Sequence, residues 1–296
     1  MKYRHSFHAG NFADVHKHIT LLALLRALKK KDKGFLYLDT HAGRGSYDLS
    51  GVPAEAAGGV GRFLEAQHEA QHEAPELREY AALIARLRTL TARRHLYPGS
   101  PLIAAAELRA QDRAVLIELQ GVEAHALEQS LSNLADARAT ELPVRVERGD
   151  GFPRLKAWLP PPERRGLTFI DPPNEETQRD FREVTAALVE AAHRFPTGVL
   201  AAWYPIKDER TIGPWHTECL RALRAALALP PAVAASELWL YRRDSRVALN
   251  GSGLLIVNPP WLTLERMQVW LPELQASLTT SADAGSSARL LSESGR

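Results

Sequence analysis

Acidic residues follow four segments that are typical of buried β-strands. They are Asp39 after FLYL, Glu118 after AVLI, Asp150 after VRVERG and Asp171 after GLTFI. Because ligands of an open parallel sheet bind beyond the carboxyl ends of its strands, we expect these side chains to surround one pocket. A single acid at such a place often only caps the following helix. Four in succession favour a shared ligand site.

The residue types predict a ligand with positive charge and sugar hydroxyls. Glu118, after the second strand, is placed to accept hydrogen bonds from a ribose, and Asp150 could accept from the exocyclic amine of an adenine. Gly43 and Gly45 in the turn THAGRG allow the backbone to approach a bulky ligand. The turn does not match G-x-G-x-x-G, and the chain has no G-x-x-x-x-G-K-[ST] phosphate loop. We therefore expect S-adenosylmethionine as the cofactor, with Asp39 among its ligands.

Two Pro-Pro corners compete for a catalytic role, GLTFIDPPN at 166–174 and GLLIVNPPW at 253–261. A side-chain oxygen and a backbone carbonyl of such a corner could bind both N–H groups of an exocyclic amine. They would then aim its lone pair at an electrophilic methyl group, which is catalysis by positioning. Asp171 could also take up the released proton. By residue type alone the second corner fits better, because Trp261 offers a face on which a base can stack.

Topology favours the first corner. GLTFI follows directly after three acid-ended strands, whereas GLLIV is joined to ELWLYRR by a short loop. A closing hairpin makes the last strand antiparallel, so its carboxyl end lies at the edge away from the ligand. We therefore predict Asp171 as the catalytic residue, and we expect Trp261 to pack beneath a purely structural corner.

Strand-like segments alternating with helical ones predict an α/β fold with a mostly parallel sheet. We expect a Rossmann-like methyltransferase fold with seven strands, the last antiparallel. Residues 51–96 are rich in Ala, Glu, Gln and Arg and have helical periodicity, which predicts an inserted helical subdomain. We assign residues 1–280 to the methyltransferase domain. The Ser-, Ala- and Gly-rich residues 281–296 are expected to be a disordered tail.

Bulk composition excludes several classes of protein. The chain has 296 residues, of which 45% are hydrophobic, and a formal net charge of +2. Cys219 is the only cysteine, so there is neither a disulfide framework nor a cysteine-based zinc site. We find no signal peptide and no membrane-spanning run. These features predict a soluble cytoplasmic protein without a membrane partner.

Histidines near the expected pocket raise the alternative of a metal site. His16 and His18 would point about 200° apart on a helix and could not chelate one ion together. We therefore predict no metal, and expect His18 and His41 to contact the cofactor and His5 to meet RNA. The arginines of 242–246 are further candidates for RNA contact, because arginine pairs with phosphates and stacks on bases.

Several blocks of the sequence together resemble the RlmJ family of adenine-N6 methyltransferases of large-subunit ribosomal RNA. The blocks are YRHSFHAGNFADVHKH, FLYLDTHAGRGSY, YPGSPL, GDGF, FIDPP and SGLLIVNPPW. The resemblance runs from residue 3 to about 275 and implies a helical subdomain after the first strand. It also implies cofactor contacts from His18, His41, Ser100, Glu118, Asp150, Gly151 and Asp171. Asp171 is then the proton acceptor and Tyr3 lies near the RNA adenine. Lys17 belongs to the same N-terminal block and is assigned with it to the RNA.

One residue departs from the family pattern. The family corner is Asp-Pro-Pro-Tyr, whereas this chain has Asn174, so the adenine loses a stacking face worth about 1–3 kcal/mol. This departure supports one alternative, a catalytically weakened nucleic-acid-binding protein. A second alternative is a DNA adenine-N6 methyltransferase, which would use the same corner, but no extended segment resembles a sequence-reading module. Our first prediction is a monomeric enzyme that methylates unassembled large-subunit ribosomal RNA.

Overall fold

The computed structural model describes residues 8–51, 54–69, 73–173, 177–243, 245, 249–279 and 281–292. The strands are β1 (Leu36–Asp39), β2 (Ser46–Asp48), β3 (Leu96–Pro98), β4 (Arg113–Glu118), β5 (Val144–Arg148), β6 (Gly166–Ile170), β7 (Val199–Ile206), β8 (Val233–Trp239), β9 (Gly251–Val257) and β10 (Gly285–Ser292). The helices are α1 (Phe12–Lys29), α2 (Ala54–Ala56), the π-helix η2 (Ala57–Gly61), α3 (Arg62–His68), α4 (Pro75–Leu90), α5 (Ser100–Glu107), α6 (Gly121–Arg138), α7 (Gly151–Trp158), α8 (Thr177–Arg194), α9 (Glu209–Ala226) and α10 (Thr263–Leu278).

The central sheet has the strand order β10-β8-β9-β7-β6-β1-β4-β5 within the described residues. Strands β5, β4, β1, β6 and β7 pair in parallel, and β9 runs antiparallel to both β7 and β8. The predicted α/β fold with its antiparallel last strand is therefore confirmed. The sheet has eight strands rather than the predicted seven.

The eighth strand comes from a segment that we expected to be disordered. Residues 285–292 form β10, which pairs antiparallel with β8 at the edge of the sheet. Arg289 on β10 donates to Glu237 on β8 at 2.6 Å, and the Glu237 side chain is fully buried. The prediction of a disordered tail over 281–296 is wrong for this part, because the weak composition signal of the segment is overridden by tertiary pairing.

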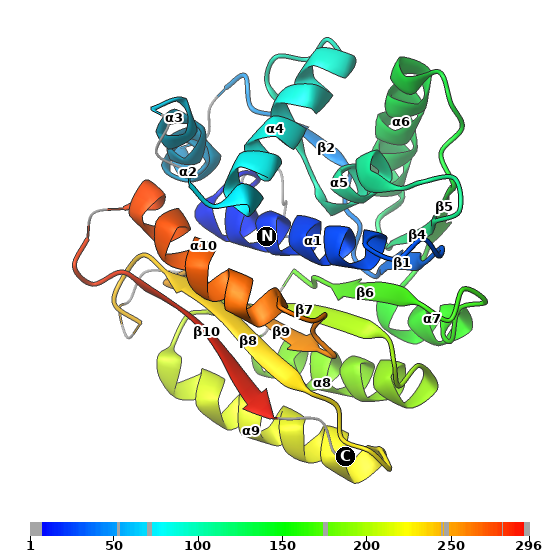
Figure 1. Cartoon of the computed structure of the whole chain (residues 1–296), viewed down its shortest axis with the longest axis vertical. Helices are drawn as coiled ribbons and strands as arrows, with labels where there is room; N and C mark the ends of the chain where they lie inside the picture. Colours follow the sequence, from blue (N-terminus) through cyan, green and yellow to red (C-terminus); the bar gives the residue numbers. More distant parts are fainter. Residues whose placement is uncertain are drawn as a thin grey trace.

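Helices cover both faces of the sheet (Figure 1). On one face α1, α5, α6 and α10 pack against the strands, and α7, α8 and α9 pack on the other. Side chains of β1 alternate between the two layers. Tyr37 contributes to the first core and Leu36 and Leu38 to the second. Both faces are apolar, which is why these strands are continuous hydrophobic runs in the sequence.

The described part of 51–96 contains α2, η2, α3 and α4. These elements lie beside α1 and α10, beyond the helical layer that covers the sheet (Figure 1). Phe63 and Tyr80 are fully buried and pack ring to ring at 5.6 Å between centroids. Among the described residues, no helix is long and apolar enough to cross a membrane.

Candidate active site

A cavity of about 1060 Å³ opens at the carboxyl edge of the parallel strands. Its wall includes residues that follow β1, β4, β5, β6 and β7, together with residues from the first turns of α1. This is the edge at which an open parallel sheet binds its ligands. The volume is at the upper end of the range for a pocket that takes one small molecule, so there is room for more than one ligand.

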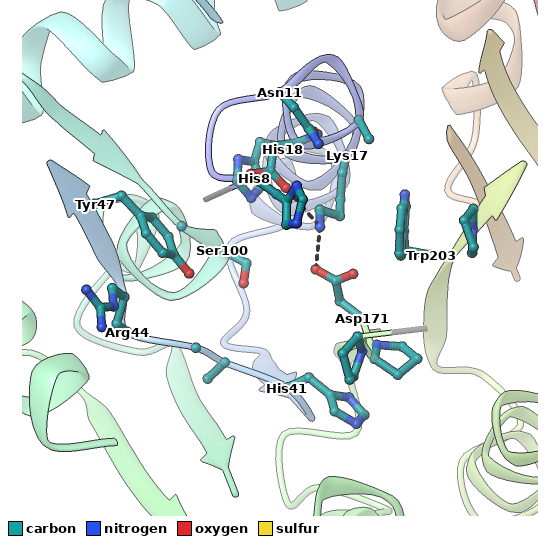
Figure 2. A pocket seen from close by; sticks show the side chains of 18 of the residues that line it. His8, Asn11, Lys17, His18, His41, Arg44, Tyr47, Ser100, Asp171 and Trp203 are labelled. Carbon is teal, nitrogen blue, oxygen red and sulfur yellow. Dashed lines mark hydrogen bonds and ion pairs between the residues drawn. The ribbon is translucent and has the colours of Figure 1, made fainter. Parts of the chain in front are cut away.

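Asp171 lies at the centre of this cavity, directly after β6. Its side chain is 14% exposed, and its Oδ2 lies 2.6 Å from Nζ of Lys17 on α1. Pro172 and Pro173 follow and also line the cavity. Because proline lacks a backbone N–H and fixes φ, the chain leaves the sheet here and the carboxylate has a rigid support. Figure 2 shows Asp171 and Lys17 pointing toward each other.

Lys17 belongs to the core of this site. Its ammonium also pairs with Asp14 at 3.1 Å, one turn earlier in α1, and only 4% of the side chain is exposed. It lies 4.8 Å from the centroid of the Trp203 ring, near enough for a cation–π interaction. The i, i+3 spacing of Asp14 and Lys17 is visible in the sequence and could have predicted this pair.

Trp203 forms the cavity wall next to Lys17, and hydrogen-bonded side chains on the side away from the cavity hold its indole ring in place. Its indole N–H donates to Oγ of Ser252 at 2.9 Å, and that oxygen is 3.0 Å from Nδ1 of His16. Nε2 of His16 is 2.9 Å from Oγ of Ser236. Burial lowers the pKa of His16 to about 3, so the imidazole is neutral and serves the packing of this wall. His16 and His18 therefore have different neighbours, as expected for two side chains that point about 200° apart on one helix.

Glu118 and Asp150 line the half of the cavity on the other side of β1. Glu118 accepts from the backbone N–H groups of Gly43 at 2.8 Å and Gln120 at 2.7 Å. Burial raises its pKa above the usual value. Asp150 accepts from the N–H of Phe152 at 3.0 Å and caps α7. Both acids therefore accept hydrogen bonds from nearby backbone N–H groups, which is the structural alternative to ligand binding. Both also face the cavity.

Two glycines bring backbone to the cavity wall. Gly43 has φ +63°, a left-handed conformation that glycine adopts without steric cost. At Gly151 a Cβ would lie 1.9 Å from the carbonyl oxygen of Thr40. This contact is too short for any side chain, so α7 can approach the turn after β1 only because residue 151 is glycine.

Asp39 does not line the cavity, although we predicted it as a cofactor ligand. It is fully buried and accepts from Tyr37 Oη and Ser100 Oγ, both at 2.7 Å, and from the N–H of His41 at 3.2 Å. Burial raises its pKa to about 6, with the nearby Asp171 adding to the shift. Asp39 instead orients Ser100, which does line the cavity.

The predicted histidines His18 and His41 both line the cavity. Nδ1 of His18 is 2.9 Å from the hydroxyl of Tyr97. The ring of His41 contacts Phe152 edge to face at 4.8 Å between centroids, and burial lowers its pKa to about 4. His41 is therefore neutral near pH 7. Figure 2 shows these side chains around Ser100 and Asp171.

The second corner lies at the opposite edge of the sheet, as predicted from the antiparallel β9. The Asn258 amide donates to the carbonyls of Pro196 and Gly198, which precede β7, at 2.8 and 2.9 Å. The expected packing of Trp261 is wrong. Its side chain is 83% exposed, and Leu262 follows it with a left-handed φ of +63°.

The predicted RNA contacts Tyr3 and His5 lie outside the described residues, as does Asn174 of the Pro-Pro corner. No group of three or more His, Cys, Asp or Glu residues able to bind a metal ion occurs in the part of the chain that the structure describes.

Comparison with known proteins identifies the family. The family model described as "Ribosomal RNA large subunit methyltransferase D, RlmJ" matches residues 32–290. Two proteins named Ribosomal RNA large subunit methyltransferase J, from Escherichia coli and Haemophilus influenzae, are each 39% identical, with 94% of both chains covered. A crystal structure of a Legionella pneumophila protein is 34% identical and has a TM-score of 0.78, covering 97% of this chain and 98% of that one. The chain therefore belongs to the RlmJ family of ribosomal RNA large subunit methyltransferases.

Proposed function

We propose that this protein is an S-adenosylmethionine-dependent methyltransferase that modifies the N6 amine of an adenine in large-subunit ribosomal RNA. The observation that carries the proposal is the position of Asp171. It stands on a rigid proline corner in the middle of a large cavity, between an acid-lined half and a half with aromatic side chains. The relatives named above carry the ribosomal RNA activity in their names, which supports the substrate class.

The acid-lined half of the cavity, which we call the cofactor half, fits S-adenosylmethionine chemically. Glu118 is placed to accept from ribose hydroxyls, as acids after the second strand do in such sheets. Asp150 and the neutral His41 add polar groups, and Gly43 and Gly151 allow close approach of the ligand to the backbone. We assign His18 and Ser100 to the same ligand because they line the adjoining wall. When bound, the cofactor supplies the electrophilic methyl group.

Asp171 would act on the adenine amine. A carboxylate oxygen and the carbonyl of the proline corner would accept from the two N–H groups, which directs the nitrogen lone pair toward the cofactor half. Asp171 then takes up the proton that the amine releases. Lys17, at 2.6 Å, balances the charge of this carboxylate in a site with little solvent. A base in a helix must leave its stack to reach this depth.

We also propose a domain organisation, the residues that contact the RNA and the form of the substrate. Residues of about 51–96 form the helical insertion of a methyltransferase domain that spans residues 1–280, and Tyr3, His5 and Lys17 contact the RNA. The enzyme acts as a monomer on naked RNA, before the subunit assembles.

The test begins with titration of the protein by S-adenosylmethionine in a calorimeter. Labelled cofactor is then incubated with a large-subunit rRNA transcript, assembled large subunits, small-subunit rRNA and DNA of the same sequence, and the modified nucleoside is identified by mass spectrometry. N6-methyladenosine at one position of the naked transcript is expected. Preferential labelling of DNA would favour a DNA methyltransferase. Cofactor binding without transfer to any nucleic acid would favour a catalytically weakened binding protein.

A further inference from the structure

The cavity continues past Asp171 into a region that the catalytic proposal does not use. We call it the rim lobe and define it by five lining residues, Pro205, Lys207, Leu240, Tyr241 and Leu249. They come from the end of β7 and from the connection between β8 and β9. Tyr241 is 46% exposed although it lines the cavity, so its ring is accessible from solvent.

We propose that the rim lobe binds an RNA nucleotide next to the target adenine, with its base stacked on Tyr241 and its phosphate beside Lys207. This inference rests on the proposed function and adds a subsite for the flanking RNA. Enzymes that act on an extruded base commonly select their substrate through contacts with the neighbouring nucleotides.

Position along the sheet supports a flanking nucleotide rather than the target itself. Lys207 follows β7, which is next to β6, and Tyr241 follows β8, which lies three positions from β6. Since neighbouring strands are about 4.8 Å apart, the ends of β8 and β6, after which Tyr241 and Asp171 follow, are about 14 Å apart. A purine whose amine contacts Asp171 cannot also stack there, whereas the next nucleotide of a splayed strand can.

The side chains of the rim lobe differ in chemistry from those of the cofactor half. The cofactor half has the carboxylates Glu118 and Asp150, which suit a cationic ligand, whereas the rim lobe combines an ammonium with an aromatic ring. Partial burial lowers the pKa of Lys207, and the carboxylate of Asp180 on α8 acts against this shift. Basic groups and aromatic faces that line one groove are the combination with which proteins bind single-stranded nucleic acid.

The rim lobe is also built as a rigid support. Asn250 is fully buried, and its amide donates to the carbonyls of Lys207 at 2.9 Å and Ser245 at 3.0 Å. Oγ of Ser245 donates back to Oδ1 of Asn250 at 2.6 Å. This one side chain therefore joins the loop after β7 to the connection between β8 and β9. A preorganised surface loses less entropy when it binds.

Arg243 extends the same support on the outer side. It pairs with Glu209 at 3.0 Å and lies 4.7 Å from the centroid of the Trp239 ring. Its carbonyl accepts from the N–H of Glu209 at 3.1 Å. Arg243 thus serves the frame of the loop, and Tyr241 and Lys207 are the groups that face the cavity.

The first test compares Tyr241→Ala with Tyr241→Phe, which keeps the stacking face. RNA affinity is measured by fluorescence anisotropy with a short RNA centred on the methylated adenine, or with a large-subunit rRNA fragment if no adenine is methylated. Tyr241→Ala should weaken RNA binding about 5- to 150-fold, as expected for the loss of one stacked base. KM for RNA should rise more than kcat falls, because the contact is made in the ground state as well. Tyr241→Phe should remain near wild type.

A second comparison uses RNA that lacks one flanking base. An abasic residue next to the target should weaken RNA binding by the wild type. Tyr241→Ala should bind the abasic RNA almost as well as the intact RNA, because the stacking partner is already absent. An equal loss in both proteins would overturn the proposal. So would wild-type RNA affinity in Tyr241→Ala.

Lys207 gives an independent readout. Lys207→Ala should lower the slope of log affinity against log salt by about one ion, whereas Lys207→Arg should keep it. An unchanged slope in Lys207→Ala would contradict the phosphate contact. Trp261→Ala, an exposed aromatic at the opposite edge of the sheet, serves as the control. Cofactor affinity, measured by calorimetry, verifies that each variant is folded.

These results separate the subsite from the proposed function. If the wild type fails to methylate rRNA, the function is refuted, while the anisotropy comparison still tests the rim lobe. If the wild type methylates rRNA and the Tyr241 variants bind it equally, only the subsite is refuted.

Discussion

Replacement of Asp171 tests the core of the proposed chemistry. In Asp171→Ala the adenine amine loses a hydrogen-bond acceptor and the reaction loses its proton acceptor. Removing a general base typically costs about 100- to 10,000-fold in rate, and we expect a fall in methyl transfer of at least this size. The cofactor half is lined mainly by other residues, so S-adenosylmethionine should still bind.

The effect of the same change on stability follows from its ion pair. Asp171 lies 2.6 Å from the Lys17 ammonium, which is 4% exposed. Leaving a buried charge without any partner costs about 3–5 kcal/mol. Here Asp14 remains at 3.1 Å from the same nitrogen, so we expect a loss of about 1–3 kcal/mol, typical of one hydrogen bond to a charged group. A domain stable by about 5–15 kcal/mol remains folded after such a loss.

Asp171→Asn separates the two roles of the carboxylate. Asparagine keeps the size of the side chain and one acceptor oxygen, but it cannot take up a proton at neutral pH. If proton uptake matters, the Asn variant should lose nearly as much activity as the Ala variant. Retention of most activity would reduce Asp171 to a positioning residue.

The assays for this series are methyl incorporation into the rRNA transcript, calorimetric cofactor titration and urea unfolding. Asp136→Asn, at an exposed position of α6, is the matched control. Near-wild-type turnover in Asp171→Ala would refute the assignment of the catalytic corner. Loss of cofactor binding together with turnover would show that Asp171 serves the cofactor instead.

Three further changes test the supporting structure. Burial raises the pKa of Asp39 from 3.8 to about 6, so the folded state binds this proton more tightly than the unfolded state. The contribution of the protonated carboxyl to the unfolding free energy is complete below about pH 4 and is lost as the pH rises through about 6. Asp39→Asn should therefore flatten the pH dependence of the unfolding free energy by on the order of 3 kcal/mol over that window, and an unchanged slope in urea unfolding at several pH values would contradict this. Gly151→Ala places a Cβ 1.9 Å from the carbonyl of Thr40, and should lower stability by about 1–3 kcal/mol and weaken cofactor binding in calorimetry, whereas Gly121→Ala, where an added Cβ meets nothing within 4 Å, should not. Trp261→Ala should change the unfolding free energy by no more than about 0.5 kcal/mol, because the side chain is 83% exposed; a loss of several kcal/mol would show that the turn packs against the protein.

The sequence by itself determined the order of the elements and placed Asp171, the residue that we propose as catalytic, at the carboxyl edge of the sheet. Alternation of strand and helix patterns, together with acids at four strand ends, is a local property of the chain, since it depends on the period of the side chains and on turn residues. It located Asp171, Glu118 and Asp150 at one edge of the sheet. The loop length before GLLIV also predicted that the second Pro-Pro corner lies at the opposite edge.

Only the tertiary structure decided which side chains face the cavity and which lie behind its wall. Asp39 and Glu118 occupy equivalent places at strand ends, yet Asp39 is enclosed by Tyr37 and Ser100 and Glu118 is not. Strand β10 forms because β8 offers an open edge to a segment with little pattern of its own. Such contacts join residues far apart in the chain, and their energies depend on packing that no local sequence period encodes.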